Sequence, residues 1–112
     1  MAWFGGFTLE THNRIPGEYE VVTVGAAAVG LSAGKIKPES GPYANMSARA
    51  ALLSLEEGDM RFRLDGTPPT AADGHYLTSG DTLVLTGTQA MEQFQAVRAG
   101  EAGGTLRVTY FY

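Results

Sequence analysis

Cysteine is absent from this sequence, and histidine is scarce, with two residues among 112. The lack of cysteine excludes disulfide bonds and leaves no indication of a redox compartment. His12 and His75 lie far apart, and neither has a second histidine at the spacing of zinc ligands. We therefore expect no metal site and no cofactor, and we interpret His75 as a partly buried packing residue.

Clusters of positive charge and long apolar runs are also lacking. Lysine and arginine number 8 against 12 acidic residues, and the net charge is −4. No basic cluster with interleaved aromatic residues is present, which argues against a nucleic-acid partner. No apolar run approaches transmembrane length, and the residues after Met1 lack the basic region of a secretory signal. We expect a protein made in a cytoplasm that binds no nucleic acid and no membrane.

Glycine, by contrast, is abundant, with 15 residues, about twice its usual share. This abundance favours a β fold with many tight turns. Within residues 60–85, Phe62 and Leu64 alternate with two arginines, and turn signals such as Asp65-Gly66 and Pro68-Pro69 separate short apolar runs. Such alternation indicates antiparallel strands with one solvated face.

The same reasoning along the whole chain predicts strands at 18–24, 46–55, 60–64, 75–77, 82–85, 94–98 and 105–112. Residues 25–30 are either a close-packed turn or the approach to a further strand at 29–36. Residues 35–38 are expected to be an edge strand, 56–59 a hairpin turn and 89–93 one helical turn. The fold class is therefore all-β: a single antiparallel β-sandwich or jelly-roll-like domain over residues 17–112, with an extended N-terminal arm over 1–16. The predicted core comprises Phe62, Leu64, Leu83, Leu85, Leu106 and Val108.

The N-terminal arm is rich in large apolar residues but is interrupted by Gly5-Gly6 and Pro16-Gly17. It either folds over its own domain or docks on a neighbouring subunit, because aromatic residues are effective interface anchors. The candidate partner-binding residues are Trp3, Phe4, Phe7 and Leu9.

No group of residues in the chain predicts catalysis. Gly30-Leu-Ser-Ala-Gly34 matches the G-x-S-x-G pattern of hydrolases, but the chain is too short for the sheet that this motif requires. Asp65, Asp73 and Asp81 lack the spacing of a calcium loop and suit turns instead. The acids at 56, 57 and 59 are interpreted as solvated turn residues. The arginines on the polar faces of strands either pair with acids or contact a partner; they are Arg61, Arg63, Arg98 and Arg107.

One resemblance covers residues 50–112. The segments Arg61-Phe-Arg-Leu-Asp-Gly-Thr-Pro-Pro-Thr70, Gly74-x-x-Leu77, Gly80-Asp-Thr-Leu-Val-Leu85, Phe94-Gln-Ala-Val-Arg98 and Leu106-Arg-Val-Thr-Tyr110 resemble a small virion protein of tailed bacteriophages and prophages. The resemblance implies a structural protein of the virion without enzymatic activity. Its implied partners are the major capsid protein and copies of itself, with which it would form a homo-oligomer on the particle.

Among virion roles, a capsid decoration or cement protein fits a small acidic β domain with an apolar arm best. A tail, neck or host-attachment component is the nearest alternative. A small carbohydrate-binding module is a third possibility, for which Tyr76, Tyr110 and Tyr112 are the candidate aromatic residues.

Overall fold

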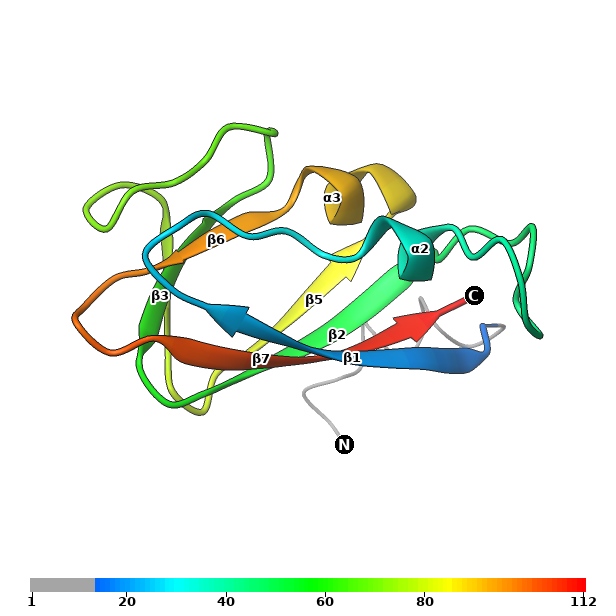
Figure 1. Ribbon diagram of the computed structural model, residues 1–112, viewed down its shortest axis with the longest axis horizontal. Helices are drawn as coiled ribbons and strands as arrows, with labels where there is room; N and C mark the ends of the chain where they lie inside the picture. Colours follow the sequence, from blue (N-terminus) through cyan, green and yellow to red (C-terminus); the bar gives the residue numbers. More distant parts are fainter. Residues whose placement is uncertain (1–13) are drawn as a thin grey trace.

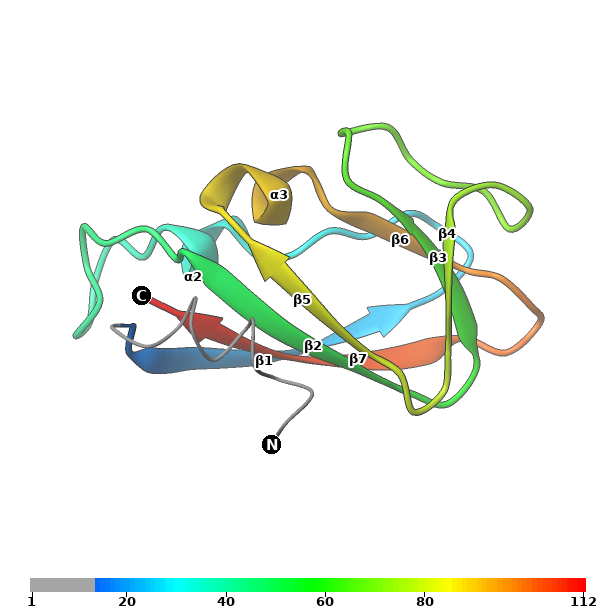
Figure 2. The same cartoon turned by 180° about the vertical axis from the view of Figure 1, so that it is seen from behind.

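The computed structural model describes residues 14–112, which form two antiparallel sheets packed face to face (Figures 1 and 2). Sheet A has the strand order β1-β7-β2-β5, and sheet B has the order β4-β3-β6. The elements are β1 (Pro16–Val24), α2 (Ala33–Ile36), β2 (Ala50–Glu56), β3 (Asp59–Arg63), β4 (His75–Thr78), β5 (Thr82–Thr86), α3 (Thr88–Gln93), β6 (Gln95–Arg98) and β7 (Gly104–Phe111). The expected all-β antiparallel sandwich is confirmed.

The core lies between the two sheets because alternate residues of each strand point inward. β7 carries buried Leu106, Val108 and Tyr110, which pair across the sheet with Leu55, Leu53 and Ala51 of β2. The two short helices close one side of the sandwich. The inward side chains from sheet B and the helical segments are Met60, Phe62, Leu77, Ala96, Ile36, Met91 and Phe94.

Five of the six predicted core residues pack in this core, four of them buried and Leu83 partly buried. Leu64 is the exception, because its side chain is 36% exposed. β3 ends at Arg63 and the turn at Asp65-Gly66 follows, so the strand alternation does not continue to residue 64. Met60, two residues before Phe62 and fully buried, occupies the core instead.

The alternative of a strand at 29–36 and the predicted edge strand at 35–38 are wrong, because no strand lies between β1 and β2. Val29 forms only an isolated bridge to Ala96, and the chain then turns into the helix α2. The helical turn places Ile36 in the core, where only 2% of its surface is exposed. Residues 25–29 instead run beside β6, since Gly25 O accepts a hydrogen bond from Arg98 N and Val29 exchanges two with Ala96.

The remaining elements follow the expectation, with shifts of a few residues at their ends. The predicted strand at 46–55 corresponds to β2, which begins at Ala50 and ends at Glu56, and the hairpin turn after it uses Glu57 and Gly58, both with positive φ. A Cβ atom on Gly58 would lie 2.7 Å from the carbonyl oxygen of Gly103, so glycine is required there. β1 begins at Pro16, and Ile15 exchanges backbone hydrogen bonds with Tyr112.

Candidate functional site

The predicted partner-binding residues of the arm lie outside the described residues. They are Trp3, Phe4, Phe7 and Leu9. The described residues that follow them in the chain lead into the edge strand β1, on whose outer face Tyr19 and Val21 are about half exposed. Ile15, also about half exposed, instead pairs with the buried Tyr112. The hydroxyl of Tyr19 accepts a hydrogen bond of 2.9 Å from Arg107, but its ring and Val21 still present apolar surface. Exposed apolar side chains on an edge strand are a candidate contact for another protein.

The inner side of β1 holds a polar network around Glu20. Its carboxylate accepts hydrogen bonds from Ser32 N at 3.1 Å, from Ser32 Oγ at 2.6 Å and from the Tyr110 hydroxyl. Burial, together with this carboxylate, raises the pKa of Tyr110 above its ordinary value. The sequence did not lead us to predict this network, although Glu20 has the same strand parity as the buried Val22 and Val24, which indicates an inward-facing acid.

This network accounts for the serine of the G-x-S-x-G pattern. Ser32 immediately precedes α2, and its hydroxyl donates to Glu20 rather than to a histidine. The motif lies in a loop and a helix of four residues, without the strand-to-helix elbow that hydrolases use.

The aspartates of the loop regions act within turns, as expected. Asp65 accepts a hydrogen bond from Thr67 N and a bidentate pair from Arg63, and this guanidinium holds the pKa of Asp65 below its usual range. Asp81 accepts from Thr78 N at 3.0 Å. No group of three or more potential metal ligands occurs among residues 14–112.

Two of the acids near the β2–β3 turn contact side chains of neighbouring strands. Glu56 pairs with Arg107 of β7 at 2.9 Å. Asp59 accepts hydrogen bonds from the hydroxyls of Thr78 and Tyr76. Both hydrogen bonds lower the pKa of Asp59, and the one from Thr78 has the larger effect.

His75 was expected to be partly buried, but it is exposed at the start of β4, with its ring 5.2 Å from that of Phe62. His12 lies outside the described residues.

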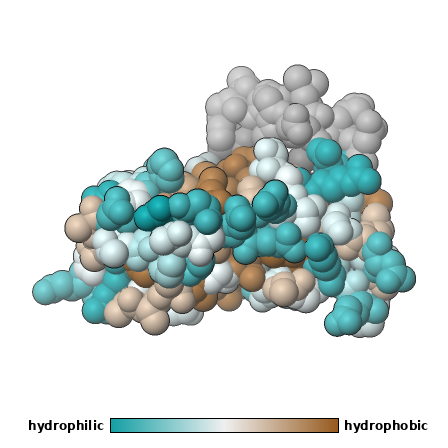
Figure 3. Space-filling model, turned by 90° about the horizontal axis from the view of Figure 1, so that it is seen from above, coloured by the Kyte–Doolittle hydropathy of each residue, from teal (hydrophilic) through white to brown (hydrophobic). Residues whose placement is uncertain are grey.

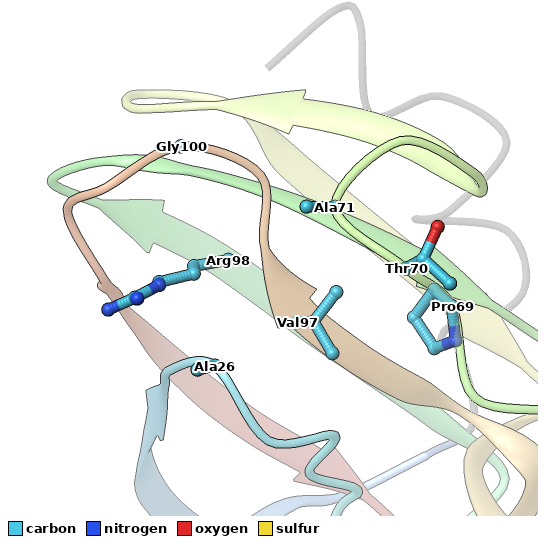
Figure 4. Close-up of a pocket in the computed structure, with 7 residues that line it drawn as sticks. All are labelled: Ala26, Pro69, Thr70, Ala71, Val97, Arg98 and Gly100. Atoms are coloured by element: carbon cyan, nitrogen blue, oxygen red, sulfur yellow. The ribbon is translucent and has the colours of Figure 1, made fainter.

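A surface hollow of about 440 Å³ lies where the loop 69–71 approaches β6 (Figure 4). The side chains of Val97 and Pro69 form its apolar wall, and Arg98 is the only charged residue lining it. Among residues 14–112, the Arg98 guanidinium has no hydrogen-bond or ion-pair partner. The hollow can accept a carboxylate of another molecule, but its lining contains no second ionisable group for acid–base chemistry.

Aromatic residues do not form a sugar-binding platform on the described surface. Tyr110 and Tyr112 are almost completely buried, and only Tyr76 of the three candidates is exposed. Tyr76 lies under the Arg61 guanidinium, 5.1 Å from the ring centroid. The face seen from above is mostly hydrophilic, with a hydrophobic area near its middle (Figure 3).

Comparison of the chain with protein-family models, curated proteins and solved structures finds no match. No helix within residues 14–112 is long and apolar enough to cross a membrane.

Proposed function

We propose that this chain is a structural protein of a bacteriophage virion without enzymatic activity, and specifically a capsid decoration protein that binds and stabilises the shell. The sequence resemblance over residues 50–112 supports the virion assignment. The observation that carries a binding role is the apolar surface of Tyr19 and Val21, which share the outer face of the edge strand β1 and are about half exposed. In the sequence, these two residues follow the arm that carries Trp3, Phe4 and Phe7. Together they provide aromatic and aliphatic anchors for a protein partner.

Several polar side chains that the sequence offers for chemistry are engaged in the fold. Ser32 donates to Glu20, Asp59 accepts from Thr78 and Tyr76, and Arg63 pairs with Asp65. These contacts support a binding role over catalysis. Esterase activity that is lost in a Ser32→Ala variant would contradict this part of the proposal.

Counting the copies of the chain in purified virions tests the assignment to the shell. A decoration protein is expected at hundreds of copies per particle, because it occupies repeated sites on the capsid. Tens of copies or fewer would instead indicate the tail, neck or host-attachment alternative. Absence of the chain from particles would overturn the virion assignment. The carbohydrate-binding alternative is not supported, since two of its three candidate tyrosines are buried.

A further inference from the structure

The strand β1 forms an open edge of sheet A. The sandwich has four edge strands, which are β1 and β5 in sheet A and β4 and β6 in sheet B. Residues 25–29 run beside β6, where Gly25 and Val29 form backbone hydrogen bonds with it. The strands β4 and β5 have only four and five residues. With nine residues, β1 is therefore the longest edge without a neighbouring strand among residues 14–112.

The register of the sheet shows which backbone groups of β1 point to the open edge. Phe111 O accepts a hydrogen bond from Arg49 on the β2 side of β7, whereas Tyr112 exchanges two with Ile15 on the β1 side. Residues of an antiparallel strand bond alternately to either side, so the even-numbered residues of β7 bond to β1. Their partners are Glu20, Val22 and Val24. The residues whose N–H and C=O groups point to the open edge are Tyr19, Val21 and Thr23.

The usual features that prevent edge pairing are confined to the start of β1. Natural sheet edges are blocked by proline, lysine, bulges or charges. Pro16 and the irregular register of β1 both precede Tyr19, and the strand contains no lysine. Apart from Glu20, the residues from Tyr19 to Val24 are aromatic or β-branched. This composition favours pairing with a further strand.

The two acids of β1 do not block the edge, because each is already paired within the domain. Glu18 forms an ion pair of 3.2 Å with Lys35. Glu20 accepts hydrogen bonds from Ser32 and from the Tyr110 hydroxyl. A strand that approaches the edge therefore meets no uncompensated carboxylate, provided that it places no acid of its own directly opposite.

We infer that β1 pairs with β1 of a second copy of this chain, antiparallel and across a two-fold axis at Val21. In this register, Val21 faces Val21 of the second copy, and Tyr19 faces Thr23. The open N–H and C=O groups meet in these pairs, and each pair exchanges two hydrogen bonds. On the other face of the sheet, Glu20 faces Val22. The edge is thus complementary to itself, as a two-fold interface requires.

The neighbouring registers are less favourable. An axis at Glu20 places this carboxylate directly opposite its copy, and like charges that face each other destabilise a sheet. An axis at Val22 pairs Tyr19 with Gly25, whose carbonyl already accepts a hydrogen bond from Arg98. Moving the axis further in either direction shortens the run of open groups that meet.

Pairing of the two edges joins two four-stranded sheets into one continuous sheet. It also brings together the half-exposed side chains of Tyr19 and Val21 from both copies on one face. The inference rests on the proposed binding role of this surface and names its partner. The experiments below use the free protein, so their failure would leave the virion assignment to the copy count in particles.

Sedimentation of the full-length chain over a series of concentrations tests the association. We expect a monomer–dimer equilibrium. Val21→Lys places two lysines opposite each other and is expected to weaken the dimer about tenfold or more. Thr82→Lys is the matched control, because Thr82 is exposed and lies in the same row of the sheet, on the opposite edge strand β5. It should leave the equilibrium unchanged.

Cross-linking of single-cysteine variants tests the register, since the chain has no cysteine of its own. In Val21→Cys the two thiols of a dimer face each other, with Cα atoms about 5.5 Å apart. Tyr19→Cys is matched in exposure, at 49% against 48%, but its two copies are offset by four residues, or about 14 Å. A bifunctional thiol reagent shorter than this offset should cross-link Val21→Cys several-fold faster.

Circular dichroism verifies that each variant is folded. If Val21→Lys does not fold, Thr23→Lys replaces it, at an exposed position that also faces the open edge. A protein that is monomeric at every concentration overturns the inference and leaves the edge to a strand of a different protein. A dimer that Thr82→Lys weakens as much as Val21→Lys also overturns it, as does equal cross-linking of the two cysteine variants.

Discussion

At the scale of single residues, two buried tyrosines give the protein a defined response to alkaline pH. Burial, followed in importance by the charge of Glu18, raises the pKa of the Tyr112 hydroxyl to about 12. Burial likewise raises the pKa of the Tyr110 hydroxyl. The unfolded chain releases both protons near the ordinary value of 10.0. The stabilising contribution is therefore complete below pH 10.0 and decreases as the pH rises toward about 12.

Urea unfolding measured from neutral to alkaline pH tests this expectation. The free energy of unfolding of the unmodified protein should fall above pH 10.0. A double variant with Tyr110→Phe and Tyr112→Phe should show a smaller fall, because phenylalanine has no hydroxyl to titrate. An identical decline in the two proteins would assign the alkaline response to other groups.

The contrast between Phe62 and Leu64 tests the register of β3. Phe62 is 7% exposed, and its ring centroid lies 5.7 Å from that of Phe94. Phe62→Ala is expected to reduce the free energy of unfolding by about 3–5 kcal/mol. Leu64→Ala, at an exposed position, should change it by no more than about 0.5 kcal/mol. A loss below about 1 kcal/mol for Phe62→Ala would contradict this placement.

At the scale of elements, Arg61 holds the loop that follows β3. Its guanidinium donates from Nε to Ala71 O at 3.2 Å and from Nη1 to Gly74 O at 2.9 Å. Arg61→Ala should therefore increase amide hydrogen exchange and proteolytic cleavage within residues 65–74. Arg107→Ala, on the outer face of sheet A, should leave this loop protected. Equal protection in both variants would show that Pro69 packing and the Arg63–Asp65 pair hold the loop without Arg61.

Most strands could be predicted from the sequence because alternation and turn residues are local signals. In residues 105–112, apolar and polar residues alternate clearly, and the turn at Glu57-Gly58 separates two further runs of alternating apolar and polar residues. The connection from β1 to β2 was not predicted, since Val29 and Ile36 find their partners in distant β6 and in the core. Similarly, the hollow beside Arg98 arises only when residues 69–71 fold over β6.

At the scale of the whole molecule, the free energy of burying the arm determines what kind of site it can bind. Three aromatic residues remove about 150–250 Å² each from water on burial. At about 25 cal/mol per Å², the gross gain is on the order of 10 kcal/mol. Ordering the arm costs about 1–2 kcal/mol per residue, so ordering its sixteen residues cancels this gain. We therefore expect the arm to bind only where a partner presents a preformed site.

Deleting residues 2–9 tests this balance. All seven strands of the described residues lie between residues 16 and 111, so the truncated chain is expected to keep the β-sandwich and a cooperative thermal transition. It should lose occupancy on particles, because the anchors Trp3, Phe4 and Phe7 are removed. Sedimentation of shells with each protein measures occupancy, and a Ser32→Ala variant with an intact arm serves as a control. If the truncated chain unfolds, the arm belongs to the core of its own domain, and a separate role in binding a partner is contradicted.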